Sequence, residues 1–294
     1  MSHGAVRFAA VSALVLAGAA AVTTCGGSPA RPTPNPGTPA NTPPTVTAIT
    51  ASSSRVEVGV PVTLTATVAD AETPVENLIY TWTAGTGTFA GTGRVVTWTP
   101  GADAVTPGDF TVTLTVIERY TSGSSVLENK ATGTATLHVN NSPKELADLS
   151  LRFLADFANS KIDPQECVSG FSDACSGKRA ELQDITDNRH DFEILSSSLH
   201  HTSLQIGPSS TSATVHTACT FTSRVITTSP ESGGCKANPG SCAFGSTQTV
   251  DGDCWTTNVY DNGRWWLCES HFAGKGPLTL FERAFFGSAP TDGR

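Results

Sequence analysis

The chain has 294 residues, enough for two domains of ordinary size. Its 18 Lys and Arg against 26 Asp and Glu give a formal net charge of −8, which argues against nucleic-acid binding, because proteins of that class gather Lys and Arg on one surface. Charged residues make up only 15% of the chain, and Thr is abundant, a composition that favours strands over long helices.

The first residues have the pattern of a secretory signal. Arg7 supplies a positive charge, and residues 8–22 are apolar and rich in Ala, too short a stretch to span a bilayer. The signal ends in Val-Thr-Thr-Cys-Gly around Cys25, which resembles a bacterial lipobox, whose cysteine is acylated and becomes the new N-terminus. We therefore predict a lipoprotein signal peptide at residues 1–24 and lipidation of Cys25. The alternative is cleavage after Ala21, which would leave Cys25 as an ordinary thiol.

Residues 25–44 have the composition of a tether. Proline recurs among Gly, Ser, Asn and Thr, so the segment stays extended and builds no core. Because Gly26, and not Asp, follows the cysteine, lipoprotein sorting rules favour the outer membrane of the cell envelope. The predicted partner of this end of the chain is therefore a membrane.

Residues 45–140 read as short strands with a period of two. Residues 62–68 and 110–116 alternate an apolar residue with Thr, which places the apolar side chains on one face. Further strands are predicted at residues 78–82, 95–98 and 131–139, and Gly and Pro mark the turns between them. Several alternating strands at this spacing predict an all-β sandwich.

The order "VTLTATVADAETPVENLIYTW", "GRVVTWTP", "PGDFTVTLTV" resembles the PKD-type immunoglobulin-like domain. The resemblance implies a sandwich without disulfides, used as a spacer or adhesive module on exported bacterial proteins, with Trp82 as its core tryptophan. Asp70 and Glu72 are candidate calcium ligands at its rim. Two carboxylates are too few for Ca²⁺, which takes six to eight oxygens, so we favour a solvated loop there.

The second domain is predicted at residues 142–290 and begins with helices. Ser142 stands as the cap, Pro143 at the first helical position and Glu145 where a capping box needs it. A second helix is predicted at residues 178–190, with Leu182 and Ile185 inward. Strands follow at residues 192–206 and 213–225, and a hairpin over residues 250–272 turns at Asn262-Gly263.

Helices followed by "SATVHTACTFTSRV" and "DCWTTNVYDNGRWWL" resemble the nuclear-transport-factor-2-like superfamily, which includes ketosteroid isomerase and the SnoaL-like cyclases. The resemblance implies an α+β cone with a curved antiparallel sheet. No acid or Tyr of this chain can be matched to the catalytic positions of the isomerase, so the activity does not carry over.

Seven cysteines lie in the second half of the chain, and an exported protein is free to oxidise them. They are Cys167, Cys175, Cys219, Cys235, Cys242, Cys254 and Cys268. Because seven is odd, one of them is expected to be free or paired between chains. We predict two local disulfides, Cys167–Cys175 and Cys235–Cys242. No zinc spacing is present, so neither a metal nor a cofactor is predicted.

The candidates for a binding pocket in the cone are Asp184, His216, Arg224, Tyr260 and His271. Asp184 recurs with Asp187 and Asp191 on one helix face, which suits either acid–base chemistry or a solvated surface. His216 and Arg224 share one side of their strand, opposite Val215, and face water if the helices cover the Val215 side. His271 shares a face of the last strand with Glu269, either as an acid–base pair or as a pair on the rim.

The hairpin determines which aromatic residues enter the core. A two-residue turn at Asn262-Gly263 sets Val259 opposite Trp266, Thr257 opposite Cys268 and Trp255 opposite Ser270. We take the face of Trp255, Val259, Trp266 and Cys268 as the core side, with Tyr260, Trp265, Leu267, Glu269 and His271 on the other.

Two functional hypotheses follow. The first is a non-catalytic envelope lipoprotein whose sandwich spaces a disulfide-bonded binding domain, for a protein or small-molecule ligand, away from the membrane. The second is an enzyme or small-ligand binder that uses the cone pocket. The polar residues do not converge on any reaction, and nucleophile and phosphate-binding motifs are absent, so we favour the first hypothesis. A filled cone supports the first, and a deep, partly polar pocket that contains His216 or Asp184 supports the second.

Overall fold

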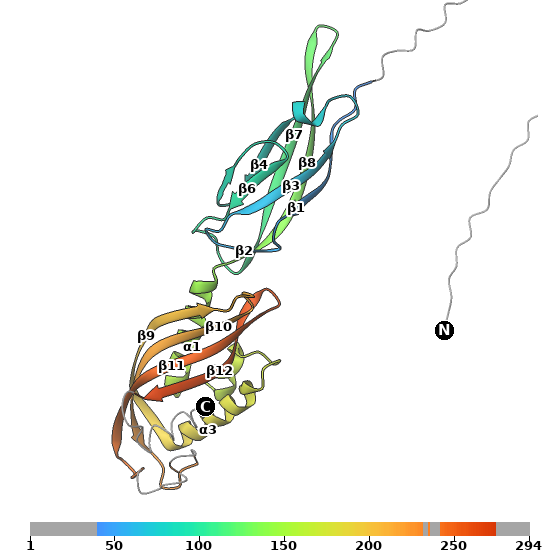
Figure 1. Cartoon of the computed structure of the whole chain (residues 1–294). Coiled ribbons are helices and arrows are strands. Elements are labelled where there is room, and N and C mark those ends of the chain that lie inside the picture. Colours follow the sequence, from blue (N-terminus) through green and yellow to red (C-terminus); the bar gives the residue numbers. More distant parts are fainter. Residues whose placement is uncertain (1–39, 232–234, 236–241, 275–294) are drawn as a thin grey trace, which may run out of the picture. The chain divides into compact units, whose positions relative to one another are not determined.

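The computed structural model describes residues 40–231, residue 235 and residues 242–274 (Figure 1). The predicted signal peptide, the lipobox with Cys25 and most of the tether lie outside the described residues, and so does the end of the second domain as predicted. Within the described part, no helix has both the length and the apolar character needed to cross a membrane.

The first domain contains two four-stranded sheets, so the predicted β-sandwich is confirmed. Its elements are β1 (Thr45–Ala51), β2 (Arg55–Glu57), β3 (Val62–Ala69), the 3-10 turn η1 (Val75–Asn77), β4 (Ile79–Ala84), β5 (Thr88–Ala90), β6 (Val95–Thr99), β7 (Gly108–Ser122) and β8 (Ser125–Asn140). One sheet has the order β1-β3-β6-β5 and the other β2-β8-β7-β4. All pairs are antiparallel except β2 with β8.

The Thr alternation of the sequence becomes the two faces of these sheets. Every second residue of β3 is buried, and the side chains of Leu64 and Leu114 are completely covered. The tryptophan at the centre of the core is Trp98, which is fully buried, whereas Trp82 is half-buried. Trp82 nevertheless packs against both core clusters of the sandwich, as expected of a core residue, and its indole N–H donates to the Gly93 carbonyl (3.0 Å).

At the sandwich rim, Asp70 closes a local turn. Its Oδ1 accepts hydrogen bonds from the backbone N–H groups of Glu72 (3.0 Å) and Thr73 (2.7 Å), as carboxylates do in Asx turns. Among the described residues, no three His, Cys, Asp or Glu side chains gather in a way that could hold a metal ion. Glu72 is exposed, whereas Asp70 is half-buried and its Oδ2 is covered without a hydrogen-bond partner, so only Glu72 has the surroundings of a solvated loop.

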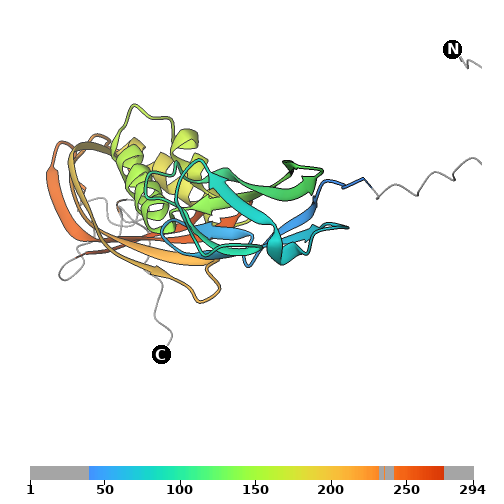
Figure 2. The same cartoon turned by 90° about the horizontal axis from the view of Figure 1, so that it is seen from above.

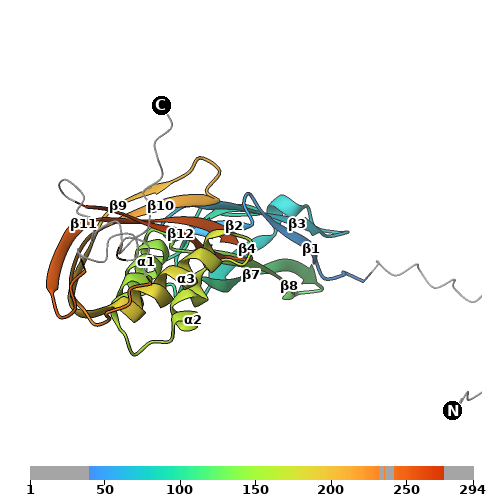
Figure 3. The same ribbon diagram turned by 90° about the horizontal axis from the view of Figure 1, so that it is seen from below.

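The second domain packs helices on one face of a four-stranded antiparallel sheet. Its elements are α1 (Ser142–Ala158), α2 (Pro164–Cys167), the 3-10 turn η2 (Val168–Gly170), α3 (Gly177–Asp191), β9 (Phe192–Ile206), β10 (Ser212–Val225), β11 (Thr247–Asp261) and β12 (Arg264–Gly274). The sheet order is β12-β11-β10-β9, and its long strands curve around the helices (Figure 2). Figure 3 shows α1 and α3 on the same side of this sheet. The predicted α+β cone is confirmed.

Helix α1 starts one residue earlier than the sequence predicts. The cap is Asn141, whose side chain accepts a hydrogen bond from the Lys144 N–H (3.3 Å). Glu145, one position beyond the N3 residue of a capping box, accepts a hydrogen bond from the Asn141 N–H (2.6 Å) in the same reciprocal way. Ser142 does not act as the cap, because its hydroxyl is buried and accepts a hydrogen bond from the Trp265 indole N–H (2.8 Å).

Aromatic and aliphatic side chains fill the cone between the helices and the sheet. Phe153 of α1 meets Phe171 edge to face at 5.1 Å between ring centroids, and Phe157 meets Phe221 of β10 at 5.7 Å. Ile185 of α3 is completely buried in the same cluster. The concave side of the sheet is therefore used mainly for packing.

The hairpin of β11 and β12 corrects the predicted core face. Val259 opposes Trp266 as predicted, but a register shift beside Thr257 places Glu269 opposite Thr257 and His271 opposite Trp255. Trp265 and Leu267 are buried, with exposed fractions of 3% and 0%, whereas Trp266 is only half-buried. The bulge explains the error in pairing beyond residue 267, since one extra residue shifts the partners by one. It also reverses the alternation of faces, so that Glu269 and His271 lie off the core side as predicted. The prediction that Trp266 and not Trp265 faces the core is wrong independently of the bulge, because both residues lie between the turn and the register shift.

Three disulfides lie in the described part: Cys175–Cys268, Cys219–Cys254 and Cys235–Cys242. The predicted Cys235–Cys242 pair is confirmed, and the predicted Cys167–Cys175 pair is wrong. Cys167 is buried on α2 as a free thiol, because its sulfur points toward Asp156 and Arg189 while Cys175 faces β12. One unpaired cysteine among the seven agrees with the odd count.

Candidate functional site

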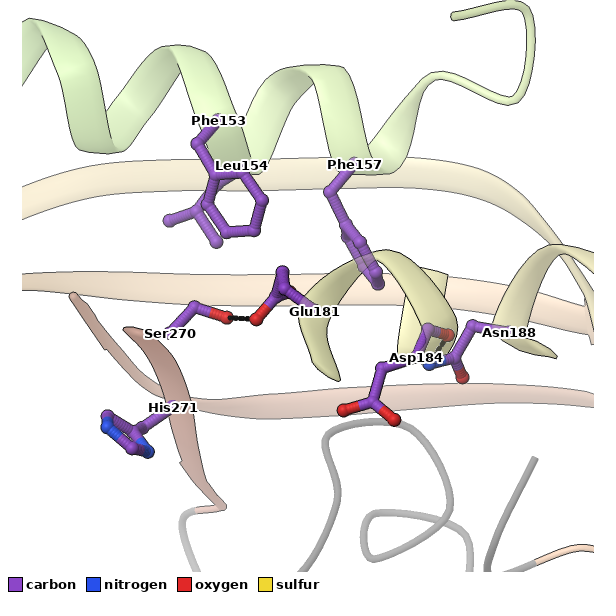
Figure 4. A pocket seen from close by; sticks show the side chains of 8 residues that line it. All are labelled: Phe153, Leu154, Phe157, Glu181, Asp184, Asn188, Ser270 and His271. Carbon is purple, nitrogen blue, oxygen red and sulfur yellow. Dashed lines mark hydrogen bonds between the residues drawn. The ribbon is translucent and has the colours of Figure 1, made fainter. Parts of the chain in front are cut away.

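A small pocket lies between α1, α3 and β12 (Figure 4). Its lining residues are Phe153, Leu154, Phe157, Glu181, Asp184, Asn188, Ser270 and His271. It encloses about 30 Å³, room for a water or two or for the tip of a larger molecule. The apolar wall comes from α1, and the polar groups come from α3 and β12.

Glu181 is the central polar group of the pocket. In Figure 4 it points toward Ser270, whose hydroxyl donates a hydrogen bond of 2.5 Å to Glu181 Oε2. Burial raises the pKa of Glu181 to about 7, and the nearby negative charge of Asp184 adds to the rise, while the bond from Ser270 opposes it. Near neutral pH this carboxyl therefore exchanges a proton readily.

The three aspartates of α3 have separate environments. Asp184 lies at the pocket, where burial and the charge of Asp187 raise its pKa. Asp187 accepts a hydrogen bond from Gln183 (2.7 Å), and Asp191 is fully buried, where it accepts one from the Glu231 N–H (2.8 Å). Of the three, Asp184 alone lines the pocket, so they do not form one acid–base group.

His271 lies at the edge of the pocket and turns its ring away from Glu181 (Figure 4). The ring stacks on Trp255 with 5.1 Å between centroids, and its Nε2 lies 3.3 Å from the Glu269 carboxylate. On the other side of Trp255 stands His216, at 6.0 Å. These side chains form a row on the outer face of the sheet, away from the helices.

The other candidates lie outside the pocket. The helices cover the Val215 side of β10, so His216 and Arg224 face outward, where His216 pairs with Asp253 (2.6 Å) and Arg224 pairs with Glu193. Tyr260 packs edge to face on Trp265 at 5.4 Å in a separate cluster. The structure thus brings Asp184 and His271 to the pocket, but not His216, Arg224 or Tyr260.

Sequence reasoning did not identify Glu181 and Ser270 as site residues. Glu181 lies three residues before Asp184, at helical spacing, so the same periodicity that singled out the aspartates could have included it. Ser270 carries no such signal, because its inward direction depends on the register shift in the hairpin.

The pocket can bind a donor group or exchange a proton. It combines two carboxyls with an apolar wall, and none of the hydrogen bonds or ion pairs of the described residues joins a Lys or Arg to Glu181 or Asp184. A cation or a strong hydrogen-bond donor would therefore be stabilised there, whereas an anion would be repelled.

Comparisons with known proteins agree with the two-domain organisation. Residues 47–130 match the family model of the PKD domain. No curated protein sequence matches the chain.

Solved structures resemble the chain only weakly. One is a putative scytalone dehydratase from Novosphingobium aromaticivorans, with 14% identity, a TM-score of 0.34, and coverage of 46% of this chain and 85% of that chain. Another is a hexachlorocyclohexane dehydrochlorinase, with 10% identity, a TM-score of 0.31 and coverage of 51% and 95%. A Mycobacterium tuberculosis protein of unknown function has 11% identity, a TM-score of 0.32 and coverage of 47% and 73%. At these scores the likenesses carry no inference about activity.

The architecture of the second domain rests on its own elements, helices α1 and α3 against one face of a curved antiparallel sheet. The chain thus contains a region, residues 47–130, that matches the PKD domain, followed by an α+β domain with a curved antiparallel sheet.

Proposed function

We propose that this chain is an exported envelope lipoprotein whose PKD domain serves as a spacer and whose cone domain binds a ligand without transforming it. The single observation that carries the binding role is the pocket of Glu181, an acidic, apolar-walled recess between α1, α3 and β12. With about 30 Å³, it admits the end of a ligand and leaves the rest outside. The chemistry favours a terminal ammonium or another strong donor on an apolar stem.

Three disulfides among the described residues indicate an extracytoplasmic protein. The lipid anchor at Cys25 and the outer membrane as its location extend this proposal. They are supported by the lipobox resemblance and by the proline-rich segment that follows.

The pocket proposal is tested with two probes of equal stem, hexylammonium and 1-hexanol. We expect hexylammonium to shift the NMR signals of Glu181 and Ser270 at pH 8 and to bind at least about tenfold more tightly than hexanol, because a hydrogen bond to a charged group contributes about 1.5–3 kcal/mol. Affinity should rise from pH 6 to pH 8, as Glu181 loses its proton.

The variant Glu181→Gln should remove this preference for the ammonium. The matched control is Glu193→Gln, a carboxylate that pairs with Arg224 on the outer face of the sheet and should leave binding unchanged. Equal binding of both probes, or undiminished binding by Glu181→Gln, would contradict the proposal.

An enzyme is the second candidate, and the pKa of Glu181 favours it. A carboxyl with a pKa of about 7 suits general acid–base catalysis at neutral pH. The two roles differ in one observable: a binder returns its ligand unchanged, whereas an enzyme converts it with a rate that depends on Glu181.

A further inference from the structure

The two halves of α3 are held in different ways. In its C-terminal half, Ile185, Asn188 and Asp191 are buried, with exposed fractions of 0%, 6% and 0%. Its N-terminal half, residues 177–184, has no fully buried side chain. In the N-terminal half, Leu182 packs against the core cluster but is only partly buried, so hydrophobic packing holds the beginning of the helix less firmly than its end.

The beginning of α3 is also attached to β12. Cys175, two residues before the helix, is bonded to Cys268, and the two Cα atoms lie 5.2 Å apart. Gly177 lies so close to β12 that a Cβ at this position would come within 2.2 Å of the Cys268 carbonyl oxygen. One turn further along, Glu181 accepts the hydrogen bond from Ser270. The disulfide is thus the covalent link between the two elements that carry the polar side of the pocket.

This disulfide is also the most accessible of the three in the described part. Cys175 and Cys268 are both partly exposed, whereas Cys219 and Cys254 are each 2% exposed, Cys235 is fully buried and Cys242 is buried. A thiolate must reach a disulfide sulfur to attack it, so exposed disulfides are reduced before buried ones.

We propose that Cys175–Cys268 is a redox latch on the Glu181 pocket: a dithiol reductant breaks it and frees the N-terminal half of α3 from β12. In the reaction, the dithiol gives up two electrons and two protons, the protein disulfide becomes two thiols, and the reductant becomes its own disulfide. Reoxidation closes the pocket again. The inference rests on the proposed function for its biological meaning, since a latch regulates the site only if the site binds a ligand.

The test begins with the full chain in its oxidised state. Dithiothreitol is added in rising concentration, the free thiols are alkylated, and peptides are mapped. We expect Cys175 and Cys268 to be modified at concentrations that leave Cys219 and Cys254 paired. At that point, amide hydrogen exchange should accelerate by at least about tenfold over residues 177–184 and stay unchanged over residues 185–191.

A second readout reports on the pocket itself. Carboxyl-carbon NMR should show Glu181 titrating near 7 in the oxidised protein and closer to an ordinary glutamate after reduction, because the freed helix exposes the carboxyl to water. The double variant Cys175→Ser, Cys268→Ser should reproduce the reduced state without any reductant. The matched control is Cys167→Ser, which leaves all three disulfides intact and should resemble the oxidised protein.

The latch is overturned if Cys219–Cys254 is reduced first, if exchange accelerates along the whole of α3, or if the helix and Glu181 do not respond to selective reduction. None of these measurements uses a ligand. If the disulfide fails these tests, the proposal of ammonium binding by the oxidised protein is not contradicted. If ammonium binding fails, the proposed redox behaviour of the disulfide is not contradicted.

Discussion

Replacing Glu181 with Gln should stabilise the second domain at alkaline pH. The folded pKa is about 7 and the ordinary value is 4.5, so between these pH values the folded chain keeps a proton that the unfolded chain has lost. The stability that protonated Glu181 contributes to the folded state is therefore fully present below about pH 4.5 and is lost as the pH rises to about 7. At about 1.4 kcal/mol per pH unit, the cost above pH 7 reaches about 3 kcal/mol.

Glutamine carries no charge at any pH, and its side-chain oxygen still accepts the bond from Ser270. We expect Glu181→Gln and the parent protein to be about equally stable at pH 4, and the variant to be more stable by up to about 3 kcal/mol at pH 8. The assay is denaturant-dependent hydrogen exchange of amides in β10 and β11, which reports on the second domain by itself. The exposed Glu193→Gln serves as the control. A stability difference that does not grow between pH 4 and pH 8 would refute the reasoning.

Three further predictions follow from burial and from the lipobox. Trp265→Ala should destabilise the second domain by about 3–5 kcal/mol and Trp266→Ala by about 1 kcal/mol, measured by urea unfolding. The reason is that Trp265 is 3% exposed, whereas Trp266 is half-buried and lies beneath the Arg264 guanidinium; similar losses would contradict the observed face. Cys167 should resist iodoacetamide until the domain unfolds, since burial raises the pKa of its thiol despite nearby Arg189; rapid labelling of the folded protein would argue against this. Cys25→Ser should move the protein from the membrane to the soluble fraction on cell fractionation, and unchanged membrane association would exclude the anchor.

The sequence predicted a strand or helix correctly where the spacing of its apolar residues stayed regular over the whole element. Threonine alternation located β3 and β7, and the apolar spacing around Ile185 located α3. The hairpin shows the limit of this reasoning. Its turn fixes which residues of β11 and β12 are opposite only as far as the register shift beside Thr257. The turn also does not say which face meets the helices, and Trp265 and Trp266 are both large aromatic residues in the sequence.

The site depends on contacts that no local pattern encodes. Glu181 and Ser270 are 89 residues apart, and their hydrogen bond needs both the docking of α3 and the register shift in β12. The disulfide error has a similar origin, because the short separation of Cys167 and Cys175 says nothing about directions in space. Cys175 instead pairs with a residue 93 positions away.

The effect of Glu181 on the stability of the domain helps to explain why this position has a carboxyl group and not an amide. A glutamine would keep the bond to Ser270 and avoid the loss of stability above neutral pH, so packing within the domain does not require the charge. Among the interactions of the described residues, no cationic side chain compensates it, and Asp184 and Asp187 add negative charge on the same helix. Apart from the hydrogen bond from Ser270, the ionised form therefore lacks a cationic partner within the described part of the chain, and a cation entering the pocket would supply one. Affinity gained on binding would then be coupled to release of a proton, which calorimetry in buffers of different ionisation enthalpy can measure directly.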